Sequence, residues 1–490
     1  MTARRRAAAT AVALATLLGA AACTSDAPER EDGPHVVGVQ MFQWTWDALA
    51  EECERTLGPA GYGWVMTSPP QEHMLGEEWW TAYQPVSYLV ESRLGTREQF
   101  ATMVQRCEEA GVAVYADAVV NHMTGIGDDE QVATGWAGSS YRHYEYPGIW
   151  TEDDFHRCGL TPDGDIADYR NSLQVRECEL VNLADLRTEE PRVRERLRAY
   201  LADLVSLGVT GLRIDAAEHM PPEDVAAIVA DLPDDVAILQ EVIRGAGEPI
   251  APEHYVDAGL VYEFVWGESL VGMLQGGSLR VFADLGSVAM LDSEHAVTFV
   301  DNHDTERNGR TLTAEDGATY ALANVLLLAT DYGTPVVYSG YAFSDRDAGP
   351  PQDADGAVID ATCPAEVGPA VGRSEGEWVC THAWPAVAGM VGFHDATHGE
   401  PVTDWWDDTR QIAFGRGDAG FVVVNKAEEP YEGTWSTSLA AGTYCDVVAG
   451  PMVDGACAGE TVEVADDGTV TATVAPVSAL AIHALALARP

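Results

Sequence analysis

The chain has 490 residues, which is enough for two or three domains and a large core. Hydrophobic residues make up 46% of it, as in globular proteins. The formal net charge of −50 argues against nucleic acid and anionic membrane surfaces as partners.

The N-terminus has the pattern of an export signal. "MTARRR" is a basic start, and the apolar run "AAATAVALATLLGAAA" is too short and too Ala-rich for a membrane span. Cys23 follows at once, which resembles a bacterial lipoprotein signal, although Ala20 stands where such signals often have Leu or Ile. Ordinary secretory cleavage near Ala22 is the alternative. Both interpretations predict a signal peptide over residues 1–22, a linker over 23–34, and an extracellular protein that is secreted or held by lipid at the outer face of the membrane.

Without Cys23, the number of cysteines is even, which in an exported chain indicates disulfides. They are Cys53, Cys107, Cys158, Cys178, Cys363, Cys380, Cys445 and Cys457. Spacing alone does not fix their pairing.

From residue 35 onward, strand and helix patterns alternate. The predicted strands are 35–42, 62–69, 112–122, 209–215, 236–242, 259–264, 296–304 and 334–339. The predicted helices are 45–61, 96–111, 189–208, 222–232 and 318–331. The strands are almost continuously apolar, which is typical of parallel strands buried on both faces, and the repeat predicts an α/β fold with a (β/α)₈ TIM barrel.

Two segments depart from this alternation. Residues 122–182 are rich in Gly, Asp and Tyr and predict a subdomain inserted after the third strand. The barrel is therefore expected to comprise residues 35–121 and 183–398. Beyond these, short alternating runs such as "QIAFGRG" and "GFVVVNKA" predict a C-terminal all-β domain, a β-sandwich, over 399–490.

Four of the predicted strands end in charged residues: "DAVVNH", "GLRIDAAEH", "LQEVI" and "FVDNHD". Arg213 and Asp215 stand two apart on a strand, so they share a face. A single carboxylate at a strand end is readily explained as a structural salt bridge. Packing alone would not gather acids on four neighbouring strand ends, because each raises the pKa of the others. Glycoside hydrolysis does require clustered carboxylates.

These four segments resemble the four short signatures of the α-amylase family, and the similarity covers nearly the whole mature chain. The segments "ECERTLGPAGYGWVMTSPPQEH", "WWTAYQPVSY" and "FVDNHDTER" are typical of its animal and actinobacterial branch. The resemblance implies a retaining endo-hydrolase of α-1,4-glucosidic bonds in starch, glycogen and related glucans. A monomer whose partner is the α-glucan substrate is expected. A 4-α-glucanotransferase and a non-catalytic glucan-binding lipoprotein are the alternatives.

The resemblance also implies residue roles. Asp215 would be the nucleophile, Glu241 the general acid/base, and Asp304 the carboxylate that stabilises the distorted sugar. Arg213 would keep Asp215 ionised by lowering its pKa. The implied sugar-binding residues are Trp79, Trp80, Tyr83, Gln84, Asp117, His122, Tyr169, Arg213, Glu218, His219 and His303. For the Trp pair, core packing is the alternative. Glu218 departs from the family, which often has Lys there, and a carboxylate cannot donate in its place.

A structural calcium site follows from the same resemblance. Asn121, Asp185 and the backbone carbonyls of Arg176 and His219 would be its ligands, and an all-oxygen set suits Ca²⁺. The alternative is that Asp185 only caps a helix.

Chloride is not expected, although relatives hold it with an arginine and an asparagine that match Arg213 and Asn302. Val336 stands where the second basic residue would be, and a buried anion needs paired charge.

The resemblance and sequence order also suggest the disulfide pairing. The pairs are Cys53–Cys107, Cys158–Cys178, Cys363–Cys380 and Cys445–Cys457, which leaves Cys23 for lipid.

Overall fold

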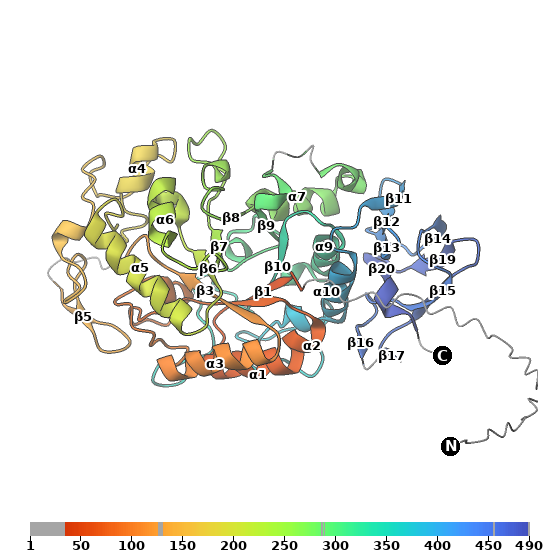
Figure 1. Cartoon of the computed structure of the whole chain (residues 1–490), viewed down its shortest axis with the longest axis horizontal. Coiled ribbons are helices and arrows are strands. Elements are labelled where there is room, and N and C mark those ends of the chain that lie inside the picture. The colour runs from red at the N-terminus through yellow and green to blue at the C-terminus, as the bar shows by residue number, and fades with distance from the viewer. Residues whose placement is uncertain (1–34, 126–130, 286–287, 289, 454–455, 489–490) are drawn as a thin grey trace, which may run out of the picture. The chain divides into compact units, whose positions relative to one another are not determined.

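The computed structural model of the chain describes residues 35–125, 131–285, 288, 290–453 and 456–488 (Figure 1). The expected signal peptide, Cys23 and the linker lie outside the described residues. Within the described part, no helix is both long and apolar enough to cross a membrane.

Eight parallel strands close into a barrel in the order β1-β2-β3-β6-β7-β8-β9-β10, with β10 pairing back to β1 (Figure 1). Their bounds are Gly38–Met41, Trp64–Thr67, Ala113–Ala118, Gly211–Ile214, Ala237–Gln240, Leu260–Tyr262, Ala296–Phe299 and Thr334–Ser339. The barrel predicted from the sequence is confirmed. Seven of the eight strands are shorter than their predicted runs, because the ends of the runs form the loops that carry polar side chains, whereas β10 has the predicted bounds.

Helices surround the barrel. The long ones are α1 (Trp46–Glu52), α3 (Arg97–Glu109), α5 (Pro191–Ser206), α6 (Pro222–Val229), α7 (Phe264–Gln275), α9 (Ala318–Ala329) and α10 (Pro385–Thr397). The short ones are α2 (Gly58–Ala60), α4 (Ser172–Glu177) and α8 (Thr305–Asn308). Helix α3 shows how the sequence sets a boundary: the side chain of Thr96 accepts from the backbone of Gln99, whose own side chain accepts from Thr96, a complete capping box.

The prediction from the sequence was wrong about the end of the sixth strand and missed the helix that follows it. The strand expected over 259–264 ends at Tyr262, and α7 begins two residues later at Phe264. The side chain of Glu263 accepts from the backbone N–H of Val265 and so caps this helix.

Between β3 and α5, the described part of the chain holds little regular structure. It contains the two-residue strands β4 (Ala133–Thr134) and β5 (Ser140–Tyr141) and helix α4. Its interior consists of stacked aromatic rings, among them Tyr141 and Tyr146, whose centroids lie 5.8 Å apart.

The C-terminal part is all-β, as predicted, with two four-stranded antiparallel sheets. The first contains β11 (Val402–Asp407), β12 (Gln411–Arg416), β13 (Gly420–Asn425) and β20 (Ser478–His483). The second contains β14 (Tyr431–Ser436), β19 (Thr469–Val474), β18 (Thr461–Val464) and β15 (Gly442–Cys445). A small pair, β16 (Met452–Val453) and β17 (Ala456–Cys457), lies apart from them.

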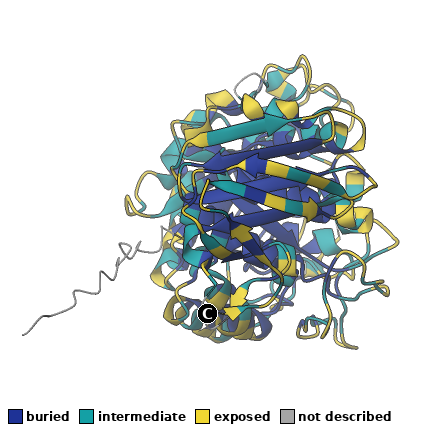
Figure 2. Cartoon of the chain, turned by 90° about the vertical axis from the view of Figure 1, so that its right-hand side faces the viewer, coloured by how far each residue is buried: buried dark blue, intermediate teal, exposed yellow. Residues whose placement is uncertain are grey.

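Strands β12, β13 and β20 of the first sheet are buried on both faces, whereas the edge strand β11 is partly exposed. In β13, Phe421 and Val423 belong to the core between the two sheets, whereas Val422 and Val424 belong to the large core that includes the barrel helices. Helices α9 and α10 pack against β20 of this sheet. In Figure 2 buried strands lie in the interior, and strands nearer the viewer alternate between buried and exposed positions.

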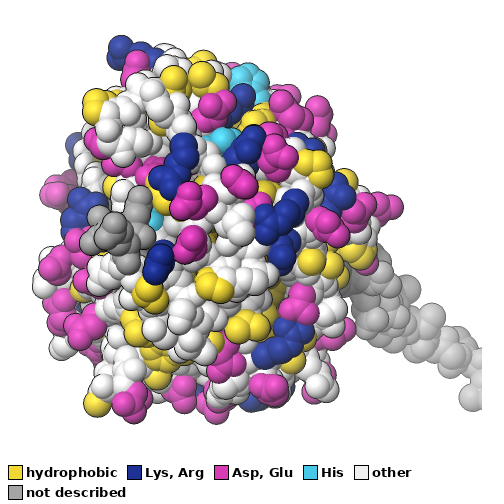
Figure 3. Space-filling model, turned by 90° about the vertical axis from the view of Figure 1, so that its left-hand side faces the viewer, with side chains coloured by type: hydrophobic (Ala, Val, Ile, Leu, Met, Phe, Trp, Pro, Cys, Tyr) yellow, Lys and Arg dark blue, Asp and Glu magenta, His cyan; other side chains and the backbone are white. Residues whose placement is uncertain are grey.

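All four expected disulfides are present: Cys53–Cys107, Cys158–Cys178, Cys363–Cys380 and Cys445–Cys457. Disulfides of this kind fit an extracellular protein. On the face shown in Figure 3, acidic side chains are spread over the surface with arginines between them. The net charge of −50 is therefore not gathered into a single patch on this face.

Candidate active site

The carboxyl ends of four barrel strands bring the acidic residues together. Asp117 lies in β3, Asp215 follows β6 directly, and Glu241 follows β7 directly. Asp304 lies in the loop after β9, at the start of α8. Parallel strands of a barrel all end at one face, which is where the chemistry of this fold is found.

Arg213 is the centre of this cluster. Its Nη1 donates to both oxygens of Asp117, at 2.7 and 2.8 Å, and to Oδ1 of Asp215 at 2.9 Å. Its Nη2 lies 2.8 Å from Oε2 of Glu241. The prediction that Arg213 and Asp215 share a face is confirmed, and the same guanidinium also joins the two neighbouring strands.

The turn after Asp215 adds a further contact. Ala216 has φ 50°, in the left-handed region that residues with a Cβ rarely adopt. Its backbone N–H donates to Oε2 of Glu241 at 2.9 Å. Because strained backbone concentrates at functional sites, this turn is a feature of the site that propensity could not have predicted.

Burial raises the pKa of three carboxyls in the cluster, those of Asp117, Asp215 and Asp304. Burial, opposed by the charge of Arg213, raises the pKa of Asp215 well above its usual range. Burial likewise raises the pKa of Asp117. Desolvation and the neighbouring charge of Glu241 raise the pKa of Asp304 to about 7. The charge of Arg213 does lower the pKa of Asp215, as expected, but burial is the larger effect, so the net shift is upward. The carboxyls of Asp117, Asp215 and Asp304 therefore bind protons more tightly than free side chains do.

A stack of rings orients Asp304. The imidazole of His303 lies between Tyr83 and Phe42, with centroid distances of 4.9 and 5.0 Å. The amide of Gln40 donates to its Nδ1 at 3.0 Å, so the ring proton is on Nε2, which lies 3.2 Å from Oδ2 of Asp304. Burial lowers the pKa of His303 well below its usual range, so the ring is neutral.

These groups surround a pocket of about 560 Å³. Nine predicted site residues line it: Trp79, Trp80, Tyr83, Gln84, His122, Asp215, Glu241, His303 and Asp304. Asp117 and Arg213 lie beneath it, fully buried, where Tyr83 also donates to Asp117 at 2.8 Å. A pocket with flat aromatic faces and clustered carboxylates can bind sugar rings and cleave the bonds between them.

Known proteins share this architecture. The family model "Alpha amylase, catalytic domain" matches residues 66–258, and "Alpha amylase, C-terminal all-beta domain" matches residues 405–484. An α-amylase of Streptomyces violaceus is 43% identical, covering 96% of this chain and 79% of that protein. The chain belongs to the α-amylase family. An α-amylase of Tenebrio molitor is 40% identical, over 91% of this chain and 96% of that protein.

A solved structure agrees with this membership of the α-amylase family. It is a variant of α-amylase I from Eisenia fetida in complex with maltohexaose, 34% identical, with a TM-score of 0.84. The match covers 91% of this chain and 97% of that one. The chain is thus an enzyme with a glycoside hydrolase catalytic domain, and its activity is starch hydrolysis.

Besides Asp117 and Arg213, three more predicted sugar contacts lie outside the pocket lining. Tyr169 is 39% exposed, and its ring centroid lies 6.3 Å from that of His219. His219 is buried and its Nδ1 donates to the carbonyl of Val175. Glu218, which stands where the family often has Lys, accepts from the backbone N–H of Ile243 at 2.7 Å. Their contacts with a sugar stay predictions.

The other residues that line the pocket were not predicted as site residues, because nothing in the sequence distinguished them. They are Met74, Gly125, Leu180, Val181, Leu183, Ala216, Arg346 and Asp347. Val181 is 77% exposed with φ 50°, which is unusual for a β-branched residue. The carbonyl of Arg346 accepts from the indole N–H of Trp79 at 3.0 Å, so the loop after β10 forms one wall of the pocket.

Asn121 and Asp185 meet beside the pocket and fit a cation. Oδ1 of Asn121 is buried and has no hydrogen-bond partner among the described residues, while its Nδ2 lies 3.3 Å from Oδ1 of Asp185. Nδ1 of His156 lies 2.6 Å from the other oxygen of Asp185. An unpaired amide oxygen beside a carboxylate supplies the hard oxygen donors that Ca²⁺ prefers. The carbonyls of Arg176 and His219 stay predicted ligands.

Proposed function

We propose that the protein is an endo-acting, retaining hydrolase of α-1,4-glucosidic bonds in starch, glycogen and related glucans. The observation that supports this most is one pocket lined by Asp215, Glu241 and Asp304, with Arg213 bonded to the first two. Retaining glycosidases need two carboxyl groups about 5–5.5 Å apart, and a shared guanidinium holds two carboxylates close together.

In this proposal Glu241 protonates the glycosidic oxygen while Asp215 attacks the anomeric carbon. The bond to the leaving glucan breaks, and a glycosyl ester of Asp215 forms. Glu241, now ionised, removes a proton from a water molecule that cleaves the ester and restores both side chains. Asp304, oriented by His303, would accept hydrogen bonds from the distorted sugar.

The aromatic wall would position the substrate. Trp79, Trp80 and Tyr83 offer flat faces to pyranose rings, while Gln84 and His122 offer polar contacts. An open pocket with walls from three separate loops suits the interior of a long chain, which supports endo action. A 4-α-glucanotransferase would use the same three carboxylates, so only its products distinguish it.

Calcium and the domain division belong to the same proposal. Asn121, Asp185 and the carbonyls of Arg176 and His219 would hold Ca²⁺, which would tie the segment 122–182 to the barrel. That segment would form one subdomain, flanked by barrel segments 35–121 and 183–398 and followed by a β-sandwich over 399–490. The enzyme would be a secreted or lipid-anchored monomer, and the disulfides support the extracellular location.

The test is Glu241→Gln with soluble starch as substrate. Loss of the proton relay should lower kcat by about 10²–10⁴-fold and leave maltohexaose binding by calorimetry intact. Glu253→Gln is the matched control, because Glu253 is half-exposed and forms its ion pair with Arg244, at 2.7 Å. NMR of the first products should show the α-anomer. Near-normal turnover by the variant would remove Glu241 from this role, and cyclic or rearranged glucans would identify a transferase.

A further inference from the structure

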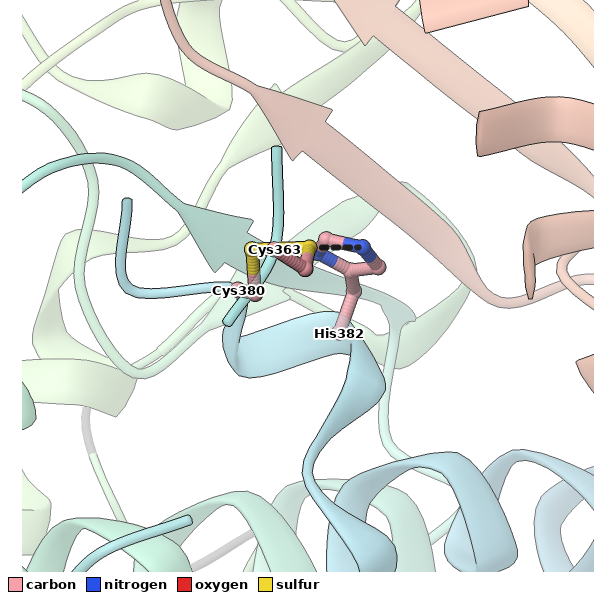
Figure 4. Close-up of side chains that lie close together, drawn as sticks. All are labelled: Cys363, Cys380 and His382. Atoms are coloured by element: carbon pink, nitrogen blue, oxygen red, sulfur yellow. Dashed lines mark hydrogen bonds between the residues drawn. A yellow bond between two sulfur atoms is a disulfide. The ribbon is translucent and has the colours of Figure 1, made fainter. Parts of the chain in front are cut away.

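Two groups of described side chains outside the pocket carry atoms that ligate metals: Cys363, Cys380 and His382, and Asp331, His394 and His398. The first group holds no open site (Figure 4). Its two sulfur atoms form a disulfide, and Nε2 of His382 lies 2.9 Å from Oε1 of Glu52. With both thiols oxidised and the imidazole paired, no ligand set remains.

The second group lies at the base of the barrel. Asp331 is in the loop between α9 and β10, and His394 and His398 are four residues apart at the C-terminal end of α10. One ligand atom from each of the three lies within 4.8 Å of the others. Oδ1 of Asp331 and Nδ1 of His398 are 2.9 Å apart.

His394 has the arrangement of a metal-binding histidine. Its Nδ1 lies 3.1 Å from the carbonyl oxygen of Leu328, to which only an N–H can bond, so the lone pair is on Nε2. The residue is 1% exposed, and Nε2 is buried without a hydrogen-bond partner among the described residues. Metal-ligating histidines typically donate their other ring N–H to a carbonyl in this way. Burial lowers the pKa of His394 to about 4, so the nitrogen is available at neutral pH.

The carboxylate of Asp331 is oriented by groups behind it. Its Oδ2 accepts from the backbone N–H of Gly399 at 3.0 Å and lies 3.3 Å from Nη2 of Arg416. These contacts leave Oδ1 for the two imidazoles. Arg416 belongs to β12 and also donates to the carbonyl of Ala329, so the group connects the barrel with the first sheet of the C-terminal part.

We propose that Asp331, His394 and His398 form a binding site for one divalent transition-metal ion, of which Zn²⁺ is the representative. The ligands would be Oδ1 of Asp331, Nε2 of His394 and a ring nitrogen of His398. Two imidazoles and one carboxylate suit Zn²⁺ and not Ca²⁺, which takes oxygen ligands. Tetrahedral Zn²⁺ places its ligand atoms roughly 3.3 Å apart, so small side-chain rotations complete the site. The 40% exposed side chain of His398 leaves room for a water as fourth ligand.

The ion would stabilise the junction between α10, the loop before β10, and β12. It would not take part in the chemistry of the pocket. Because Arg416 shares Asp331 with the ion, we expect micromolar affinity.

The experiment titrates Zn²⁺ into the full chain after treatment with EDTA, with millimolar Ca²⁺ present throughout to fill the proposed calcium site. Calorimetry should give one zinc per chain. At a concentration about 100 times the Kd, the Tm should rise by about 3 °C. His398→Ala and Asp331→Asn should each weaken binding at least about tenfold and abolish the rise in Tm, while starch hydrolysis stays normal.

The matched control is His295→Ala, because His295 is also partly exposed, at 36%, and has an acidic neighbour, with Glu294 at 3.7 Å. It should bind zinc as the unmodified chain does. X-ray absorption of the zinc-loaded chain should show two imidazoles and oxygen, which tests the ligand set without any substitution. No saturable binding, binding that survives in both site variants, or a shell with sulfur or with oxygen alone would overturn the proposal.

Discussion

A buried contact between Glu52 and His382 offers a quantitative test of how the top of the barrel is stabilised. Oε1 of Glu52, at the end of α1, lies 2.9 Å from Nε2 of His382. Both side chains are at most 1% exposed. Nδ1 of His382 lies 2.9 Å from the hydroxyl of Ser339, the last residue of β10. The pair therefore ties α1 to the end of the eighth barrel strand.

The pKa of Glu52 gives the size of the effect. Burial alone would raise this pKa, but the hydrogen bond and charge of His382, together with the hydrogen bond of Thr56 and the charge of Arg55, outweigh it and lower the pKa from 4.5 to about 2. A lowering of about 2.5 pKa units corresponds to about 3 kcal/mol of stability, since one unit is about 1.4 kcal/mol. Because the pKa is depressed on folding, this stability is present above pH 4.5 and is lost as the pH falls toward about 2.

The perturbation is Glu52→Gln, which removes the charge and keeps the shape. At an unfolding entropy of about 2.1 cal/mol/K per residue, a loss of about 3 kcal/mol lowers the Tm of a unit of this size by about 3 °C. Scanning calorimetry at neutral pH, with millimolar Ca²⁺ present, measures it. The difference from the unmodified chain should shrink between pH 4.5 and pH 2, the window in which Glu52 becomes protonated.

Glu54→Gln is the control on the same segment. The side chain of Glu54 is 49% exposed and pairs with Arg106 at the surface, and surface substitutions of this kind change stability by at most about 0.5 kcal/mol. The reasoning about the buried pair is refuted if Glu52→Gln melts with the unmodified chain, or if its deficit stays constant from pH 7 to pH 3.

Three further predictions concern ions and bridges. Starch hydrolysis should not depend on chloride, because Val336 belongs to an apolar cluster inside the barrel and Arg213 is already paired with three carboxylates. A saturable activation by sodium chloride but not by sodium nitrate would contradict this. EDTA should lower the Tm by about 3 °C and Ca²⁺ should restore it, and Asp185→Asn should lose this response while the exposed Asp163→Asn keeps it. Peptide mapping without reduction should recover the four bridges, and a peptide that links Cys23 to another cysteine would exclude its lipidation.

The barrel was predictable because its strands are buried on both faces and read as apolar runs. For the same reason, helix α7 was not predicted. Its sequence "FVWGESLVGMLQ" continues the apolar run of β8, and no turn residue separates the two elements. Periodicity cannot separate a buried strand from a buried helix over so short a stretch. The cap at Glu263 marks the change, but a single Glu is a weak signal without the structure.

Residues that line the pocket could be predicted from the sequence only where their side chains are of types that catalyse reactions or bind ligands. Acids, histidines and paired tryptophans at strand ends have few roles in packing, so their positions indicated a site. Val181 and Leu183 line the same pocket, yet nothing in their residue type separates them from core residues. They reach the pocket because the chain after α4 passes over it, and that path is set by tertiary contacts such as the bond from Leu186 N–H to the carbonyl of Asn121.

The pKa values of the clustered carboxyls depend on how the closed barrel brings its strands together. No local sequence pattern shows that arrangement. The spacing of Arg213 and Asp215 predicted one ion pair, and one cation beside one carboxylate lowers its pKa. The closed barrel places Asp117 and Glu241 on the same guanidinium from the two flanking strands. Burial inside the closed barrel, and then the negative charges of Glu241 and Asp117, raise the pKa of Asp215 by more than Arg213 lowers it. A retaining hydrolase needs one protonated acid beside one ionised carboxylate, and several carboxyls around one buried guanidinium allow such a division of roles, whereas a single ion pair does not.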